Sequence, residues 1–197
     1  MAIEQLQDLL TEDLKGVDRA IHDLLDSDIP LIPLLGNYVI DSGGKRLRPM
    51  VLLAGARMLG YDGDRHLRLA AVIELIHTAT LVHDDVVDHA EQRRTKPTAN
   101  VIWGSQAPVL VGDFLFARSF EAMVADGEMR VLDILSNATR ELAEGEVLQL
   151  QNTHDPEVDE SSYMRVVTAK TAVLFEAAAR LAAVLPGRSR EDEENLA

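Results

Sequence analysis

One stretch, Leu81-Val82-His83-Asp84-Asp85-Val86-Val87-Asp88, ends a long apolar segment of the sequence with three carboxylates. Asp84 and Asp88 are four residues apart, so on a helix they lie on one face about one turn from each other. Two unpaired carboxylates at that distance repel each other, and a hard cation offsets the repulsion. Mg2+ prefers oxygen ligands and is often shared between carboxylates and substrate phosphates. The stretch therefore predicts a helix that ends in a magnesium site.

A basic segment lies upstream of these carboxylates. The sequence Gly43-Gly44-Lys45-Arg46-Leu47-Arg48-Pro49 places three cations after two glycines, which suits a polyanion such as diphosphate. Arg93 and Arg94 form a second basic pair in the polar segment that follows the carboxylates. Each segment alone is equally consistent with solvated surface charge. Because basic groups flank the carboxylates on both sides, the combination favours a site for diphosphate and metal.

Composition places the chain among all-helical proteins. Of its 197 residues 47% are hydrophobic but only 4% are aromatic, with Ala and Leu abundant. The net charge of −14 argues against nucleic-acid binding and against attraction to an anionic membrane surface. The absence of cysteine excludes disulfides and thiolate metal sites. With neither a signal peptide nor an uncharged apolar run of ~18 residues, we expect a cytoplasmic protein without a membrane span.

Hydrophobic spacing predicts a series of helices and no strand, because no segment shows strand-like alternation. Residues 89–100 are polar and are expected to form a loop. Ser189-Arg190-Glu191-Asp192 is typical of a capping box at the start of a last helix. The expected longer helices cover residues 4–25, 29–39, 49–59, 64–88, 105–125, 128–153 and 161–185.

His77 lies seven residues before Asp84, so a helix places it on the same face two turns away, with Thr80 between them. A lone histidine in an apolar helix is more often a hydrogen-bonded core residue than a ligand. A face that carries His, Thr and Asp is unusual for a core, however. We therefore include His77 among the candidate site residues.

These motifs together resemble those of the trans-isoprenyl diphosphate synthases, or polyprenyl synthetases. The first aspartate-rich motif of that family, DDxxD, matches residues 84–88, and its GGKRxRP motif matches residues 43–49. The similarity extends along nearly the whole chain through Arg93-Arg94, Gly112-Asp113-Phe114, Gly145-Glu146-Val147-Leu148-Gln149 and Lys170-Thr171. The resemblance implies an all-α bundle around a deep central cavity, a homodimer, and a Mg2+-dependent prenyltransferase.

The resemblance also implies roles for the matched residues. Isopentenyl diphosphate would be bound by Lys45, Arg48, His77 and Arg94. Asp84 and Asp88, supported by Asp85, would hold Mg2+ on an allylic diphosphate such as farnesyl or geranyl diphosphate. Arg93, Lys170 and Thr171 would contact that second diphosphate. The allylic C–O bond would ionise, the double bond of isopentenyl diphosphate would attack the cation, and a proton would be lost.

The length of the product is predicted from the same helix. Ala79 lies five residues before Asp84, roughly 7–8 Å deeper at helical rise. In the family a bulky aromatic near this position stops elongation early, so a small residue favours a long C40 product for quinone side chains over C15 or C20. Leu75 and Ile76 are expected near the floor of the tunnel. Alternatively, Ala79 only allows close helix packing.

The family has a second aspartate-rich motif, FQxxDDxxD, which this sequence lacks. We expect residues 1–197 to be the N-terminal two-thirds of a single isoprenoid-synthase domain that is truncated at its C-terminus. Such a chain would be impaired or inactive. The alternatives are a non-catalytic partner subunit, which would not need the intact carboxylates, and a terpene cyclase, which would not need the basic segment.

Overall fold

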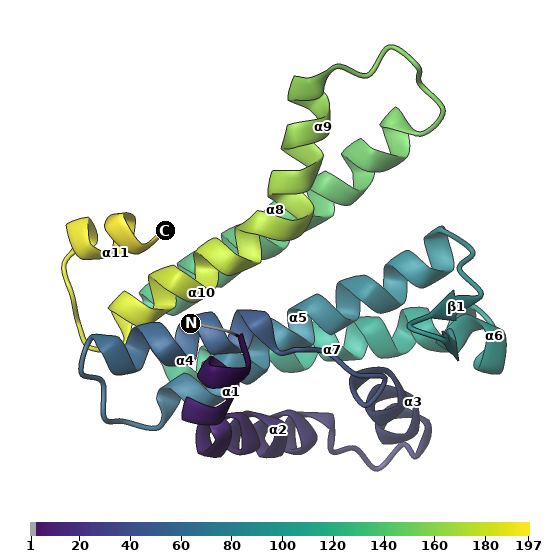
Figure 1. The fold of residues 1–197 in the computed structure, drawn as a ribbon. Helices are drawn as coiled ribbons and strands as arrows, with labels where there is room; N and C mark the ends of the chain where they lie inside the picture. The colour runs from purple at the N-terminus through teal and green to yellow at the C-terminus, as the bar shows by residue number, and fades with distance from the viewer. Residues whose placement is uncertain (1–2) are drawn as a thin grey trace.

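A computed structural model describes residues 3–197 as an almost wholly helical chain (Figure 1). A π-helical turn, η1 (Thr168–Ala172), joins α9 (Glu160–Val167) to α10 (Val173–Val184). The short antiparallel hairpin of β1 (Gln92–Arg93) and β2 (Lys96–Pro97) follows α5 (Arg65–Val87). The expected all-α class is confirmed. The helices are α1 (Ile3–Leu9), α2 (Thr11–Leu25), α3 (Leu31–Ile40), α4 (Leu47–Met58), α5 (Arg65–Val87), α6 (Ala99–Trp103), α7 (Gln106–Asp126), α8 (Met129–Asn152), α9 (Glu160–Val167), α10 (Val173–Val184) and α11 (Arg190–Leu196).

Helix α5 is the centre of the fold. It is apolar on every side over most of its length, and a helix of that kind is stable only when it is surrounded. It packs against α7, α2 and α4, and Leu69, Ile73, Leu75 and Ile76 are fully buried. Its last turn carries the aspartates out of this core, and Asp88 caps its C-terminus.

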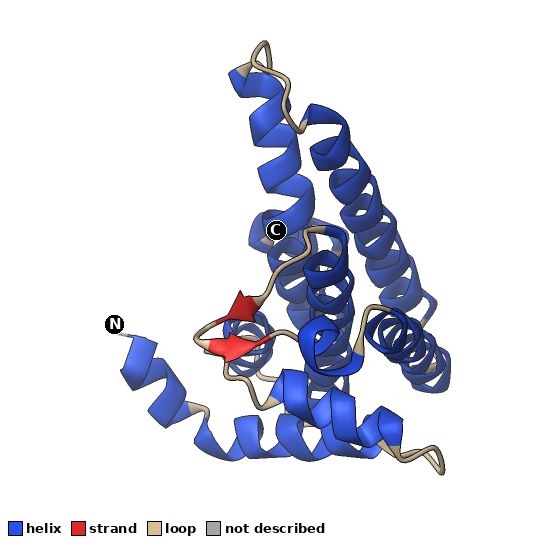
Figure 2. Cartoon of the chain, turned by 90° about the vertical axis from the view of Figure 1, so that its right-hand side faces the viewer, coloured by secondary structure: helices blue, strands red, loops and turns tan. Residues whose placement is uncertain are grey.

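A second group of helices covers one side of α5. In Figure 1, α8 and α10 run diagonally above α5 and α7, and α10 also packs on α4. Helix α11 is attached to this group by Glu193, which is 3% exposed and accepts hydrogen bonds from Arg130 on α8 and Arg180 on α10. The hairpin lies at the opposite end of the molecule from α11 (Figure 1) and faces the viewer in Figure 2. It is close to α3 through the hydrogen bond from Tyr38 to Pro97.

The helices expected over residues 64–88, 105–125 and 128–153 correspond to α5, α7 and α8. The capping box at Ser189 is also confirmed, because its hydroxyl accepts from the Asp192 amide while the Asp192 carboxylate accepts from the Ser189 amide. No helix within residues 3–197 is long and apolar enough to cross a membrane.

Three boundaries differ from the expectation. The helix expected over residues 4–25 is interrupted at Leu10, which turns fully into the core. The loop expected over residues 89–100 contains the hairpin and the start of α6, and strands of two residues are too short to show any alternation. The helix expected over residues 161–185 contains the π-helical turn, which hydrophobic periodicity does not reveal.

Candidate active site

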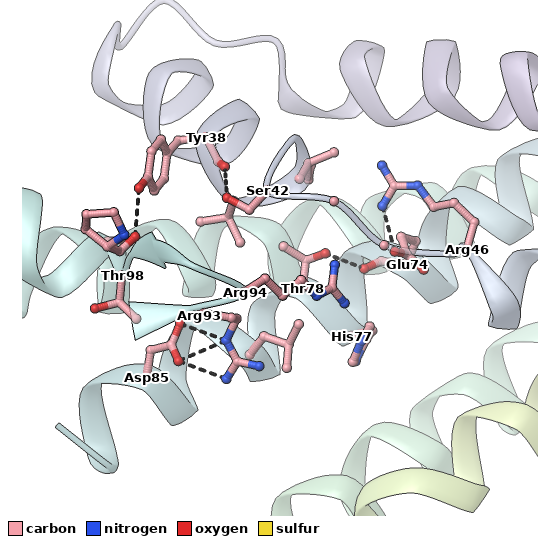
Figure 3. Close-up of a pocket in the computed structure, with 17 residues that line it drawn as sticks. Tyr38, Ser42, Arg46, Glu74, His77, Thr78, Asp85, Arg93, Arg94 and Thr98 are labelled. Carbon is pink, nitrogen blue, oxygen red and sulfur yellow. Dashed lines mark hydrogen bonds and ion pairs between the residues drawn. The ribbon is translucent and has the colours of Figure 1, made fainter. Parts of the chain in front are cut away.

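Two pockets adjoin the C-terminal half of α5. We call the first the basic pocket; its lining includes residues of the segment 42–46, of α5 and of the hairpin (Figure 3). We call the second the acidic cavity; it has a volume of about 410 Å³ and lies among α5, α7 and α8. The lining of the acidic cavity comprises Thr80, His83, Asp84, Val87, Asp88, Phe116, Phe120, Thr139, Ala143, Glu146, Val147, Gln149, Leu150 and Thr153.

Two ion pairs build the basic pocket. Arg46 has a left-handed backbone conformation (φ 51°), and its Nη1 lies 2.7 Å from Oε1 of Glu74, which is 7% exposed. Arg93 donates to both carboxylate oxygens of Asp85, with Nη2 at 2.8 Å from Oδ1 and Nε at 3.1 Å from Oδ2. These pairs attach the basic segment and the hairpin to α5 (Figure 3).

The basic pocket is lined by Arg46, Arg93 and Arg94 against Glu74 and Asp85, and Lys45 and Arg48 add cations outside its lining. Among residues 3–197, no carboxylate pairs with Lys45, Arg48 or Arg94. The Nε of Arg48 is buried without a hydrogen-bond partner, its guanidinium lies 4.7 Å from the ring centroid of Phe175, and burial lowers its pKa. Unpaired guanidinium groups that are partly removed from water suit an anion.

His77 lies in this basic pocket and is held neutral. Burial is the main cause that lowers its pKa to about 3, and repulsion from Arg48, Arg93, Arg94 and Arg46 adds to the shift. A neutral imidazole donates one hydrogen bond and adds no charge. The pocket therefore combines strong cationic character with a neutral donor, which is suited to a diphosphate.

Two glycines lie where the basic segment meets the hairpin. A Cβ on Gly44 would lie 3.3 Å from Nη1 of Arg94, and Gly43 has a φ of +92° that other residues rarely adopt. The two glycines thus let Arg94 approach the segment 43–46 closely.

A carboxylate–lysine cluster lies at the acidic cavity. Nζ of Lys170 is 2.6 Å from Oε2 of Glu146, 2.9 Å from Oε1 of Gln149 and 3.4 Å from Oδ2 of Asp84. Burial raises the pKa of Glu146 to about 7, and its hydrogen bond with Asp84 acts in the same direction. Burial alone would lower the pKa of Lys170, but its hydrogen bond to Glu146 and the attraction of both carboxylates outweigh burial and raise it.

The acidic cavity suits a hard cation that is shared with a ligand. Asp84 and Asp88 both line it, as their spacing predicts. Within residues 3–197 no group of three or more His, Cys, Asp or Glu side chains is arranged to hold a metal ion by itself. Two carboxylates fit Mg2+, which commonly keeps its remaining positions for water and phosphate oxygens.

The structure divides the predicted site residues between the two pockets. Asp85 is turned roughly 100° around α5 from Asp84, so it lies in the basic pocket and acts there through Arg93. His77 also lines the basic pocket, although the spacing predicts that it shares a face with Asp84.

Other predicted residues lie outside both pockets. Lys45 and Thr171 are exposed and line neither pocket. Arg48 and Lys170 are partly buried and also lie outside the lining of both pockets. Ala79, Leu75 and Ile76 are fully buried in the described core, and the acidic cavity is lined by the neighbouring Thr80 instead.

Three further residues of the site received no role from the sequence. Glu146 and Gln149 belong to a matched motif, but their contact with Lys170 joins residues more than twenty positions apart. Glu74 pairs with Arg46 across a similar separation. The one sign of this pair in the sequence is that Glu74 is a charged residue inside the apolar run before His77.

A family model and curated relatives both match this chain over most of its length. A family model described as "Polyprenyl synthetase" matches residues 30–197. The chain is 50% identical over 196 residues to "Octaprenyl diphosphate synthase" of Escherichia coli (strain K12), an alignment that covers 100% of this chain and 61% of that protein. The chain therefore spans about 60% of the length of the curated relatives it matches.

Solved structures of similar synthases have the same fold as this chain. A decaprenyl diphosphate synthase from Rhodobacter capsulatus superposes with a TM-score of 0.96 at 47% identity, over 98% of this chain and 60% of that one. A polyprenyl synthase from Caulobacter crescentus CB15, complexed with calcium and isoprenyl diphosphate, also has a TM-score of 0.96, at 48% identity over 99% of this chain and 60% of that one.

Proposed function

The chain belongs to the polyprenyl synthetase family, and from this premise we propose that the protein is a long-chain trans-polyprenyl diphosphate synthase. The reaction would condense isopentenyl diphosphate with an allylic diphosphate such as farnesyl or geranyl diphosphate. One observation carries this proposal: the last turn of α5 separates a basic pocket, where Arg94 has no carboxylate partner among the described residues, from an acidic cavity lined by Asp84, Asp88 and Glu146. Such a pair of sites suits two diphosphates in different environments.

In this proposal the basic pocket binds isopentenyl diphosphate. Arg48 and Arg94 would supply charge that no described carboxylate neutralises, and neutral His77 would donate a hydrogen bond. Lys45 is exposed at the rim and would have to turn inward. Arg93 is already paired with Asp85, so it would contact a diphosphate through its remaining N–H groups.

The acidic cavity would bind the allylic diphosphate. Asp84 and Asp88 would hold Mg2+ on its oxygens, and Lys170 and Thr171 would contact the same group. When bound, the metal would supply positive charge that stabilises the leaving diphosphate. The apolar lining, which includes Phe116, Phe120, Val147 and Leu150, would exclude water from the allylic cation.

We further propose a long product, most closely an octaprenyl chain. The support comes from relatives described as octaprenyl and decaprenyl diphosphate synthases, and from Ala79, which offers no bulky side chain on α5. A cytoplasmic location and a homodimer are part of the same proposal.

The proposed function is tested by Mg2+-dependent transfer of labelled isopentenyl diphosphate to farnesyl diphosphate by residues 1–197. We expect any transfer to be lost in Asp84→Ala, with the products separated by chromatography. Because the chain spans about 60% of its relatives, binding is measured alongside: farnesyl diphosphate should bind in the presence of Mg2+ and more weakly in Asp84→Ala. The absence of both transfer and Mg2+-dependent binding would contradict the proposal.

A further inference from the structure

Three acceptors from two helices surround the ammonium group of Lys170. Glu146 and Gln149 on α8 lie at 2.6 and 2.9 Å, and Asp84 on α5 lies at 3.4 Å. A lysine ammonium has three N–H donors, so this arrangement accounts for all of them. The two short contacts are to α8, and the longest is to the carboxylate that the proposed function assigns to the metal.

The backbone is built to bring Lys170 to this position. Lys170 lies in the π-helical turn η1, and such turns change the direction of the side chains that follow and occur frequently at functional sites. Gly145 on α8 allows η1 to approach, because a Cβ there would lie 2.6 Å from Cβ of Ala169 and 3.4 Å from Cγ of Lys170. The π-helical turn and Gly145 place the ammonium of Lys170 beside Glu146 and Gln149, and neither feature depends on Asp84.

The contact between Lys170 and Asp84 depends on whether a cation occupies the acidic cavity. The charged groups that line the acidic cavity are Asp84, Asp88 and Glu146, together with His83, whose Nε2 lies 3.5 Å from Oδ1 of Asp113. An ammonium 3.4 Å from Asp84 would repel a divalent cation on the same carboxylate. The two cannot share Asp84 without a cost in free energy.

We propose that Lys170 is a resident counter-ion of Asp84, and that a divalent cation has to displace it while Glu146 and Gln149 keep the ammonium at the cavity wall. This rests on the proposed function, because it takes Asp84 as a metal ligand. Glu146 and Gln149 are then positioning residues for Lys170. Metal and lysine compete in the absence of a diphosphate, and they cooperate once a diphosphate is present to accept the displaced ammonium.

The test is the binding of Mn2+ to the full 197-residue chain, measured by electron paramagnetic resonance without any diphosphate. Lys170→Met should bind Mn2+ roughly 3- to 10-fold more tightly, because the competing charge is gone. Lys170→Gln should behave in the same way, which guards against a folding defect in one variant. Arg165→Met, which removes an exposed cation of α9, should stay within about two-fold of the unchanged protein.

The second arm measures inorganic diphosphate with Mn2+ present. Lys170→Met should now bind more weakly than the unchanged protein, and this reversal of sign is not expected from a purely structural defect. Unchanged or weaker Mn2+ binding by both lysine variants in the first arm would overturn the inference. If Asp84→Asn still abolishes Mn2+ binding in that case, the proposed function survives. If neither the unchanged chain nor any variant binds Mn2+ without diphosphate, the inference fails; if none binds Mn2+ with diphosphate present either, the proposed function fails as well.

Discussion

Asp84 and Asp85 are neighbours in the chain and serve different pockets. Asp84 lines the acidic cavity beside Lys170, whereas Asp85 is 7% exposed and is bound by Arg93 in the basic pocket. Successive residues of a helix point roughly 100° apart, so one DDxxD motif can support two sites. At the scale of residues, the motif therefore contributes side chains to both pockets.

The pH dependence of stability should reveal the environment of His77. Its pKa is lowered to about 3 in the folded chain, against an ordinary value of 6.5. Between these values the unfolded chain binds a proton that the folded chain does not, so stability is full above pH 6.5 and falls as the pH decreases. Between pH 7 and pH 5 the free energy of unfolding should fall by about 2 kcal/mol less in His77→Asn than in the unchanged chain. Urea unfolding at the two pH values is the measurement.

The control is His22→Asn, which replaces an exposed histidine of α2. That variant should keep the pH dependence of the unchanged chain. If His77→Asn and His22→Asn gave parallel curves, His77 would not be held neutral by its surroundings.

Product length is tested at Ala79. Ala79→Phe or Ala79→Tyr should shorten the product in a chain that is competent for transfer, because a ring at this depth on α5 would stop elongation. Ala79 is fully buried, so overpacking should also cost about 1–3 kcal/mol of stability. Chromatography of the prenyl products is the measurement.

Thr80→Phe is the matched comparison, because Thr80 lines the acidic cavity and Ala79 does not. Shorter products from Thr80→Phe together with unchanged products from Ala79→Phe would assign chain-length control to the cavity lining and would refute the role proposed for Ala79.

At the scale of elements, the contact between α8 and η1 determines where Lys170 lies. Gly145 is buried on α8 and faces Ala169, and the absence of a side chain lets the two backbones approach. The long helix α8 is thereby held against the segment from η1 to α10, which brings Lys170 to Glu146 of the acidic cavity.

Gly145→Ala should therefore separate α8 from η1. The new Cβ would meet Cβ of Ala169 at 2.6 Å, and neither atom is at the end of a flexible side chain. We expect a loss of about 1–3 kcal/mol in the free energy of unfolding, although alanine is the better helix former. Glu144→Ala at the adjacent exposed position should change stability by less than ~0.5 kcal/mol. Equal effects in the two variants would contradict close packing at Gly145.

At the scale of the whole molecule, α7 has an exposed apolar stripe. Leu110 and Val124 are each 67% exposed, and Ala117 lies midway between them at the same seven-residue spacing. An apolar stripe of this kind on a central helix often marks an interface between subunits. It supports the homodimer that we propose.

The double variant Leu110→Glu and Val124→Glu should convert a dimer to a monomer, because burying two carboxylates in an apolar interface is unfavourable. Sedimentation velocity ultracentrifugation is the measurement. Met58→Glu on α4, where the methionine is 70% exposed, should leave the sedimentation coefficient unchanged. A monomeric unchanged chain, or a double variant that remains dimeric, would argue against α7 as the interface.

The sequence by itself determined the helical class, most helix boundaries and the shared face of Asp84 and Asp88. These features depend on hydrophobic periodicity and on contacts between residues three or four apart, which a helix imposes locally. Its clustered cations and glycines also singled out the basic segment, and resemblance to a family singled out Lys170.

Only the tertiary structure decided how those residues are divided between two pockets. The pairs Arg46–Glu74 and Lys170–Glu146 join residues that are far apart in the chain. Likewise, the lowered pKa of His77 depends on burial and on arginines from two distant segments, 43–49 and 93–94. Such contacts are set by how helices pack, and local spacing carries no information about packing between distant segments.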